Sequence, residues 1–212
     1  NKRILITAGP TWVPIDSVRV ISNIATGETG ILLARQAKEL GAKVTLFLGP
    51  TSNNDLNKSI KIQRFKFFNE LRDKIVRELR SKKYDIIIHT AAVSDFKPRQ
   101  FIRGKIDSDK AYDLKLEPLP KIIQYIRHLA PKAKLVMFKL EPLISNSSLI
   151  KRAKRAQEKV RADFVVANTV DPYRAFIIDR KGNIVSVKSK PELAKKLFQI
   201  INLTPLPAGR QV

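Results

Sequence analysis

The sequence contains no cysteine among its 212 residues. That absence excludes disulfide bonds and any catalytic step that needs a thiolate from the protein. Long apolar runs are missing too, since none approaches the roughly 18 residues that a membrane-spanning helix needs. The chain begins with neither methionine nor a signal peptide. We therefore expect a cytoplasmic protein without membrane contact, and the missing methionine leaves open that the chain is a piece of a longer product.

Acidic residues are few beside basic ones, because 19 Asp and Glu face 41 Lys and Arg and leave a formal net charge of +22. A positive field of this size attracts anions, including nucleic acid and phosphorylated small molecules. The basic residues are scattered, however, and regularly spaced aromatics on which bases would stack are not evident. A nucleic-acid-binding module is therefore a minor hypothesis, which predicts binding that weakens steeply with salt.

Two glycine-rich fingerprints are also missing. The dinucleotide-binding pattern G-x-G-x-x-G does not occur, and residues 27–30 do not form a P-loop, which needs G-x-x-x-x-G-K-[ST]. No Tyr-x-x-x-Lys pair lies near the central strand. An NAD(P)-dependent oxidoreductase on a related fold is therefore a weak alternative.

Strand and helix patterns alternate along the whole chain. Continuous apolar runs predict buried strands, and apolar residues spaced by three and four predict helices. We expect strands at residues 4–8, 43–48, 60–65, 84–93, 113–116, 134–140, 163–168, 175–179 and 183–187, and helices at residues 30–40, 69–81, 120–129, 147–161 and 191–201. The pattern predicts an α/β fold with a doubly wound, mainly parallel, Rossmann-like sheet and a C-terminal β-hairpin over residues 1–203. Residues 204–212 are expected to be a disordered tail.

Ligands bind beyond the carboxyl ends of the strands in such a sheet. Polar and special residues concentrate after four of these strands, in segments 7–16 and 94–109, at Glu141 and at Asn168. Backbone N–H groups and the dipole of the helix that begins near Gly30 are suited to an anion. After the central strand, Asp95 offers a carboxylate to a ribose or a metal, and Lys105 lies on a loop from which it can close over phosphates.

An ordered set of motifs now resembles one known family. The segments are Ile6-Thr7-Ala8-Gly9-Pro10-Thr11-Trp12, Pro14-Ile15-Asp16, Val18-Arg19, Ile21-Ser22-Asn23, Thr26-Gly27 with Gly30, Ala91-Ala92-Val93-Ser94-Asp95-Phe96-Lys97-Pro98, Gly104-Lys105-Ile106, residues 118–123, Phe138-Lys139-Leu140-Glu141 and residues 163–168. Together they resemble the phosphopantothenoylcysteine synthetase family, whose members are phosphopantothenate–cysteine ligases. The resemblance runs in order from about residue 3 to residue 201.

The resemblance implies a two-step reaction in coenzyme A biosynthesis. The carboxylate of 4'-phosphopantothenate attacks the α-phosphate of a nucleoside triphosphate, releases pyrophosphate and leaves an acyl-nucleotide. The amine of L-cysteine then attacks the activated carbonyl and expels the nucleoside monophosphate. Bacterial and archaeal members typically use CTP and eukaryotic members ATP, with Mg²⁺ on the triphosphate. Such chemistry needs positioned cations and N–H donors more than a protein nucleophile.

The same resemblance implies partners and site residues. Members are typically homodimers, and the usual N-terminal decarboxylase domain, which binds flavin, is absent from this chain, so no flavin is expected. The catalytic candidates are Asn23, which steadies the acyl-nucleotide, and Lys105, which reaches the triphosphate. The candidates for binding phosphopantothenate are Arg19, Asn23, Thr26 and Gly27. The nucleotide-binding candidates are Gly9, Ala91, Ala92, Val93, Asp95, Lys105, Pro120, Lys121, Ile122, Ile123, Phe138 and Lys159.

The loops depart from the family pattern at several positions. Val13 stands where members often have glutamate, and Glu28 stands where a lysine is commoner. Asp107 and Ser108 follow Lys105 where many bacterial members have further lysines, which leaves Lys110 as a candidate replacement. We expect Glu28 to place a negative charge beside the site.

The basic helix departs from the pattern as well. Ala156 and Val160 occupy the two positions at which CTP-using members carry base-reading lysines. Lys159 or Arg155 is the candidate to replace them. The preference for CTP over ATP is thus based on the family resemblance as a whole and not on these two positions.

Overall fold

The computed structural model describes residues 2–52 and 59–203, so the tail expected at residues 204–212 lies outside the described chain. The centre of the molecule is an eight-stranded sheet with the order β12-β11-β10-β9-β6-β1-β4-β5. In chain order its strands are β1 (Arg3–Ala8), β4 (Lys43–Leu48), β5 (Lys61–Arg64), β6 (Ile86–His89), β9 (Lys134–Leu140), β10 (Phe164–Asn168), β11 (Ala175–Asp179) and β12 (Ile184–Val187).

The strands from β10 to β5 are all parallel, whereas β11 and β12 form an antiparallel hairpin at one edge. From β1 the chain runs outward through β4 to β5, returns to β6 on the other side of β1, and continues to β9 and β10. The direction of winding therefore reverses between β1 and β6, where doubly wound sheets form a ligand crevice at the carboxyl ends of their strands. The predicted fold class, including the C-terminal hairpin, is confirmed.

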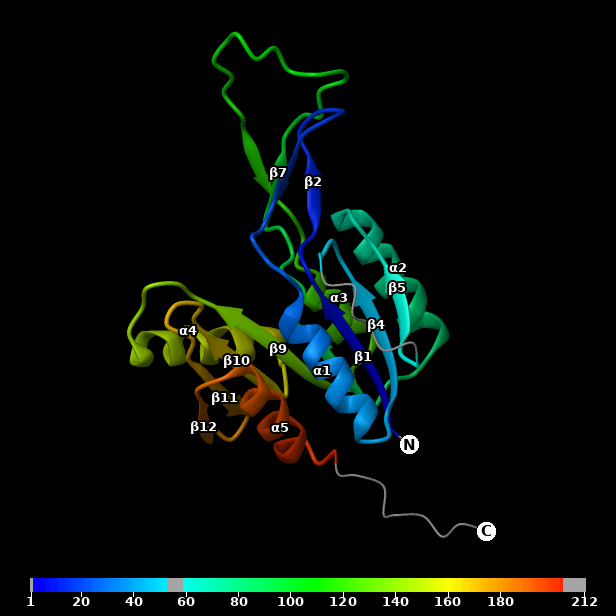
Figure 1. The fold of residues 1–212 in the computed structure, drawn as a ribbon, viewed down its shortest axis with the longest axis vertical. Helices are drawn as coiled ribbons and strands as arrows, with labels where there is room; N and C mark the ends of the chain where they lie inside the picture. The colour runs from blue at the N-terminus through cyan, green and yellow to red at the C-terminus, as the bar shows by residue number, and fades with distance from the viewer. Residues whose placement is uncertain (1, 53–58, 204–212) are drawn as a thin grey trace.

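Helices cover both faces of the sheet (Figure 1). One face carries α1 (Glu28–Glu39) and α5 (Lys190–Ile200), and the other carries α2 (Phe68–Ser81), α3 (Ile122–Leu129) and α4 (Asn146–Val160). Successive residues of β1 alternate between the two cores: Ile4 and Ile6 pack on one face and Leu5 on the other. Burial on both faces explains why the central strands are continuous apolar runs. No helix in the described part of the chain is long and apolar enough to span a membrane.

Two antiparallel ribbons project from the carboxyl edge of the sheet (Figure 1). One pairs β2 (Trp12–Pro14) with β3 (Val20–Ser22), and the other pairs β7 (Phe96–Pro98) with β8 (Leu116–Pro118). We call residues 11–26 and 95–119, which contain these ribbons, the arm. The sequence predicted only a loop at 94–111 and a strand at 113–116, which the structure corrects to β7 and β8. These short strands are largely exposed and pair with each other, so they lack the apolar pattern that reveals a core strand.

A buried carboxylate joins the two halves of the arm. The side chain of Asp16 is 0% exposed, and its Oδ1 accepts hydrogen bonds from the backbone N–H groups of Val18 (2.8 Å) and Arg19 (2.7 Å). Its Oδ2 accepts from the N–H of Ile106 (3.0 Å) and from Nη1 of Arg19 (3.0 Å). The donated hydrogen bonds, that of Ile106 first among them, lower the pKa of Asp16 to about 2. The carboxylate is therefore charged at any physiological pH.

Candidate active site

A cavity of about 150 Å³ opens at the carboxyl ends of β6 and β9, beside the start of α3. Its lining residues are His89, Ala91, Val93, Ser94, Asp95, Pro120, Lys121, Ile122, Ile123, Met137 and Phe138. An engineered cavity of about this volume in another protein holds a benzene ring. The space therefore fits one flat ring, and the rest of a nucleotide would extend beyond it.

Eight of the residues predicted to bind a nucleotide line this cavity. They are Ala91, Val93, Asp95, Pro120, Lys121, Ile122, Ile123 and Phe138. These residues come from three separate segments, which the parallel sheet brings to one edge. Ala92 belongs to the same strand end but is not part of the lining. His89 and Met137, which the sequence did not single out, complete the inner wall.

Asn23 connects the loop after β1 to the end of the central strand. Its side-chain Nδ2 donates to the carbonyl oxygens of Ala92 (3.1 Å) and Val93 (3.2 Å). A second link lies deeper, where the N–H of Ser94 donates to Thr11 Oγ1 (2.9 Å) and the hydroxyl of Ser94 donates to the Thr11 carbonyl (3.1 Å). The candidate catalytic asparagine is thus fixed beside the cavity by contacts that a carboxylate side chain cannot make.

Gly9 and Gly27 lie where the same loop passes close to the sheet. Both have positive φ, +81° and +75°, which favours glycine. A Cβ at Gly27 would stand 3.3 Å from the backbone nitrogen of Gly9, and a Cβ at Gly9 would stand 3.2 Å from Gly49. These positions therefore keep the loop, with its predicted substrate residues, tight against the start of α1.

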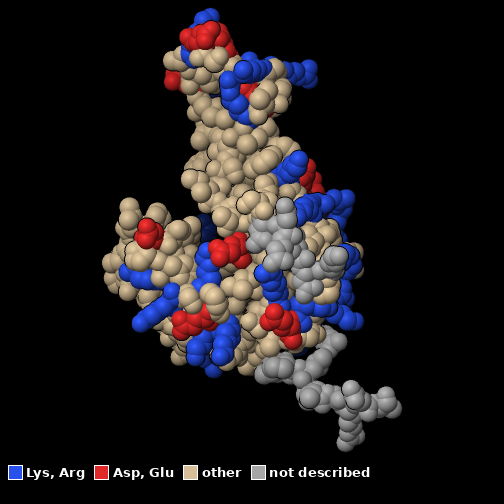
Figure 2. Space-filling model, viewed as in Figure 1, with Lys and Arg blue, Asp and Glu red and all other residues tan. Residues whose placement is uncertain are grey.

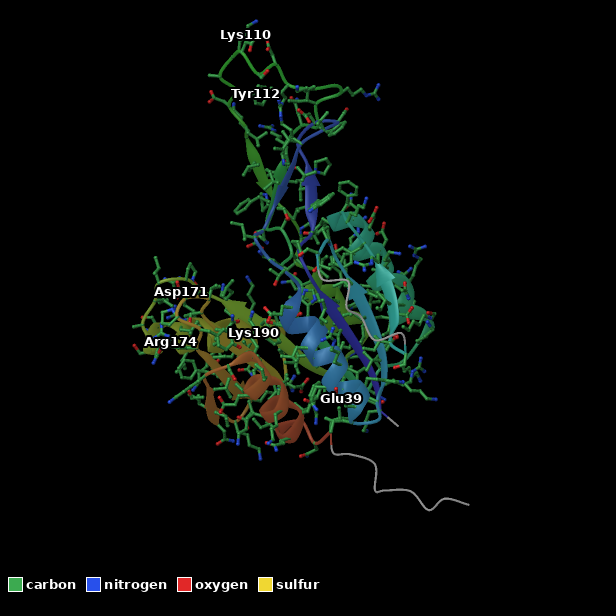
Figure 3. The ribbon with its side chains drawn as sticks, in the orientation of Figure 1. Glu39, Lys110, Tyr112, Asp171, Arg174 and Lys190 are labelled. Carbon is green, nitrogen blue, oxygen red and sulfur yellow. The ribbon has the colours of Figure 1, made fainter. Side chains whose placement is uncertain are left out.

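Glu28 begins α1, and the structure shows what balances its charge. Its carboxylate forms an ion pair with Nζ of Lys190 at the start of α5. Figure 3 shows Lys190 beside α1. The backbone N–H of Glu28 donates to the hydroxyl of Thr26 (3.4 Å), and the Thr26 carbonyl accepts from Thr51 (2.7 Å). The negative charge expected at this helix start is therefore countered from another element.

Asp95 and Lys121 form an ion pair at the rim of the cavity, where both side chains are more than half exposed. Lys121 is also the N-cap of α3 and provides no side-chain cap, so N–H groups of the first turn remain available beside the cavity. A helix start with free N–H groups attracts negative charge. In the described residues, no group of three or more His, Asp or Glu side chains is placed to hold a metal.

Lys105 and Arg19 lie on the arm and do not line the cavity. Arg19 is engaged by Asp16 and by the carbonyl of Ile106 (3.1 Å). Lys105 is exposed and follows Gly104, whose carbonyl accepts from the N–H of Ser17 (3.0 Å) at the turn between β2 and β3. The structure therefore places these two predicted residues together, but apart from the eight nucleotide candidates that line the cavity.

Lys159 also lies apart from the cavity. It is exposed in the last turn of α4, which leads into the amino end of β10, the opposite edge of the sheet from the cavity. Ala156 and Val160 pack against the core on that face. This placement gives no support to a contact between Lys159 and a base. The predicted order of helix 147–161 before strand 163–168 already indicates this, because in a parallel sheet the last turn of a helix leads to the amino end of the next strand.

Three comparisons with known proteins agree with one another. The family model DFP, "DNA/pantothenate metabolism flavoprotein C-terminal domain", matches residues 1–203. The "Coenzyme A biosynthesis bifunctional protein CoaBC" of Thermococcus kodakarensis is 38% identical over 174 residues, which are 82% of this chain and 42% of that protein. The protein of the same name from Borreliella burgdorferi is 37% identical over 203 residues, 92% of this chain and 50% of its own length.

A solved structure supports the same relationship. The crystal structure of the DNA/pantothenate metabolism flavoprotein from Streptococcus pneumoniae has a TM-score of 0.86 at 25% identity and covers 95% of this chain and 99% of that chain. The chain spans about half the length of the curated relatives it matches.

Proposed function

Because the chain belongs to the DNA/pantothenate metabolism flavoprotein C-terminal domain family, we propose that it is the phosphopantothenate–cysteine ligase of coenzyme A biosynthesis. The observation that carries this proposal is the link from Asn23 to the carbonyls of Ala92 and Val93, beside a cavity of one ring's volume. This geometry supports the proposal, because it brings the loop after β1 and the end of the central strand together at a single edge of the sheet. The matched relatives, which are named for coenzyme A biosynthesis, support the same reaction.

The proposed chemistry has two balanced steps. A carboxylate oxygen of 4'-phosphopantothenate forms a bond to the α-phosphorus, and the bond to pyrophosphate breaks. The amine of cysteine then bonds to the carbonyl carbon, loses a proton and expels the nucleoside monophosphate. Negative charge develops first on phosphate and then on the carbonyl oxygen. The chain offers the free N–H groups at the start of α3 and the cation of Lys105 to stabilise this charge, and Asn23 fixes the loop after β1 beside the site.

We propose CTP as the nucleotide, because the matched relatives are prokaryotic and prokaryotic members of the family typically use it. Mg²⁺ in proteins is commonly bound by one or two carboxylates together with substrate phosphates. Asp95 at the cavity rim offers one such carboxylate, so we expect Mg²⁺ to arrive with the triphosphate. Magnesium would neutralise charge on the phosphates as pyrophosphate leaves.

We also propose that the protein acts as a homodimer built on the arm. Large apolar side chains are exposed there, including Ile24 (105%), Phe101 (53%) and Phe96 (52%). Figure 2 shows that the stalk of the arm presents few charged side chains on this face. Exposed apolar patches of this kind mark protein interfaces. A second copy would bring Lys105 to a cavity that its own chain leaves at a distance, and Phe101→Glu should therefore yield monomers in light scattering.

The relatives are bifunctional proteins of about twice this length. We propose that the chain works fused to, or together with, a phosphopantothenoylcysteine decarboxylase that consumes its product. A cytoplasmic location follows from the proposed pathway. The oxidoreductase and nucleic-acid-binding hypotheses are set aside, because the family match and the cavity both favour the ligase.

The test is direct. Purified protein with 4'-phosphopantothenate, L-cysteine, Mg²⁺ and CTP should release pyrophosphate and form phosphopantothenoylcysteine, measured by coupled assay and mass spectrometry. The same mixture with ATP establishes nucleotide preference. Absence of turnover with both nucleotides would contradict the ligase.

A further inference from the structure

His89 is a buried histidine at the floor of the cavity, and the proposed reaction gives it no role. It ends β6 and pairs in register with Thr7 of β1 and Met137 of β9, so it stands at the point where the winding of the sheet reverses. Only 9% of the residue is exposed. Because it lines the cavity, the exposed part of the ring faces the space that a ligand would enter.

The hydroxyl of Thr7 determines which nitrogen of the His89 ring carries the proton. Thr7 Oγ1 lies 2.7 Å from Nδ1 of His89 and also accepts the N–H of Ala91 (3.3 Å). Thr7 is 0% exposed, and among the described residues its hydroxyl hydrogen has no other acceptor than Nδ1. If Nδ1 carried the proton, that hydroxyl hydrogen would be buried without a partner, at a cost that folded proteins rarely bear. The ring is therefore protonated on Nε2.

Burial also keeps the ring neutral, because it lowers the pKa of His89 to about 4. A neutral imidazole with Nδ1 occupied has a single N–H left to donate. Nε2 has no hydrogen-bond partner in residues 2–52 and 59–203. The fully buried side-chain atoms that lack a hydrogen-bond partner in those residues are Arg127 Nε, Tyr173 Oη and Arg174 Nε. Nε2 of His89 is not among them, so it is not fully buried. Nε2 is thus open to the cavity and unpaired.

The other polar side chains around the cavity are already engaged. Ser94 is bound to Thr11, and Asp95 is paired with Lys121 at the rim. The inner wall is otherwise apolar, with Ala91, Val93, Ile122, Ile123, Met137 and Phe138. One N–H donor in an apolar cavity of single-ring volume suits a heteroaromatic ring that presents an acceptor atom.

We propose that His89 is a specificity residue of the nucleotide site, whose Nε2–H donates to a ring nitrogen or carbonyl oxygen of the base. This inference rests on the proposed function, since it identifies which part of the nucleotide occupies the cavity. The triphosphate then extends past the strand ends toward the loop that carries Asn23. His89 selects for the base and takes no part in bond making.

Three variants test this role by their KM values. His89→Leu removes the donor while keeping an apolar wall, and the KM for CTP should rise about 5- to 50-fold, with kcat and the KM for 4'-phosphopantothenate nearly unchanged. His89→Gln places an amide nitrogen near the position of Nε2 and should recover most of the loss. Thr7→Val removes the hydroxyl that fixes the tautomer of His89, and its KM for CTP should lie between those of the wild type and His89→Leu. An unchanged KM for CTP in His89→Leu would overturn the proposal.

Direct binding separates this proposal from the ligase itself. Calorimetry with Mg²⁺–CTP should show the same loss of affinity in His89→Leu, whereas ribose 5'-triphosphate, which lacks a base, should bind wild type and variant equally. Binding of CTP without turnover would overturn the ligase and leave the role of His89 standing. An equal loss for CTP and ribose triphosphate would overturn the base contact.

A spectroscopic measurement on the wild-type protein guards against a variant that fails to fold. The chain has two histidines, so ¹⁵N-histidine spectra are simple to assign. We expect the Nε2–H tautomer for His89 and a shift of its Nε2 resonance on addition of CTP. A proton on Nδ1, or a resonance that CTP leaves in place, would contradict the proposal.

Discussion

The cavity and the arm carry different parts of the proposed chemistry, and they are stabilised in different ways. The walls of the cavity stand on β6 and β9, whose side chains are packed between two cores. The arm is made of three-residue strands with exposed apolar side chains, and one buried carboxylate, Asp16, joins its halves. The cavity is therefore preformed, whereas the arm depends on a few polar contacts and, as we propose, on a second copy. Mutations in the cavity should therefore change binding of the base, and mutations in the arm should change how the Lys105 cation is positioned.

Lys105→Gln tests the arm with the largest expected effect. Loss of one cation at the developing charge should lower the rate of pyrophosphate release by about 10²- to 10³-fold. The affinity for the nucleoside, which has a base and a ribose but no phosphate, should change much less, because the cavity is untouched. Lys115→Gln, an exposed lysine elsewhere on the arm, is the matched control and should stay within about twofold of wild type. Equal loss in both variants would mean that the general positive field matters and the position does not.

Asn23→Asp tests the junction between the two regions. The variant replaces a donor with an acceptor opposite the carbonyls of Ala92 and Val93. We expect product formation to fall about 10²-fold, with a smaller loss in pyrophosphate release, because the asparagine serves the acyl-nucleotide. Rapid-quench analysis of both half-reactions measures the difference. A uniform loss in the two steps would contradict this division of roles.

Asp16→Asn should loosen the arm and leave the sheet intact. The new amide would face two donors, Nη1 of Arg19 and the N–H of Ile106, where the carboxylate oxygen accepted both. We expect activity to fall about tenfold, because the cation on the arm is no longer positioned. Hydrogen exchange should quicken in residues 100–115 but not in β1 or β6. Asp109→Asn at the end of the arm is the control, and faster exchange throughout the chain would show that the two regions are not independent.

Acid should affect the two regions in different pH windows. The pKa of His89 is about 4 when folded, below its ordinary value of 6.5, so the unfolded chain binds the proton first and stability falls as pH drops from 6.5 to 4. The loss is on the order of 3 kcal/mol, and it should vanish in His89→Leu. The pKa of Asp16 is about 2 when folded, so its contribution is complete above pH 4 and is lost between about 4 and 2. Urea unfolding from pH 7 to 4 measures the first window, and an identical slope in His89→Leu would contradict it.

Lys190→Ala is expected to have the smallest effect. Its ion pair with Glu28 is partly exposed, and such pairs contribute about 0–1 kcal/mol. The unpaired Glu28 would then repel the phosphate of 4'-phosphopantothenate at the start of α1, and the KM for 4'-phosphopantothenate should rise about two- to threefold. The double variant with Glu28→Gln should restore the wild-type KM. A KM that stays high in the double variant would give Lys190 a direct role.

The sequence predicted the cavity side of the molecule better than the arm. Continuous apolar runs such as β1 and β6 exist because both faces of the sheet are covered, so the doubly wound fold could be read from them. The carboxyl ends of those strands then indicated where Ala91 and Asp95 would lie. The ribbons of the arm pair with each other in solvent, and no local pattern shows that Asp16 meets Ile106.

His89 and Lys159 show two further limits. A histidine directly after three isoleucines, in the central strand, is a visible signal of a polar side chain at the carboxyl edge of the sheet. Lys159 is predicted by counting along a helix, and the structure places it at the opposite edge of the sheet from the cavity, so its role stays a prediction.

In the proposed reaction, the cavity and the arm together form an acyl-nucleotide from 4'-phosphopantothenate. Substrate labelled with ¹⁸O in its carboxylate tests this most directly, since the attacking oxygen stays with the phosphate when cysteine displaces the acyl group. We expect one ¹⁸O atom in the released nucleoside monophosphate, found by mass spectrometry, and an acyl-nucleotide that accumulates when cysteine is withheld. Product formation with no label in the nucleoside monophosphate would contradict it.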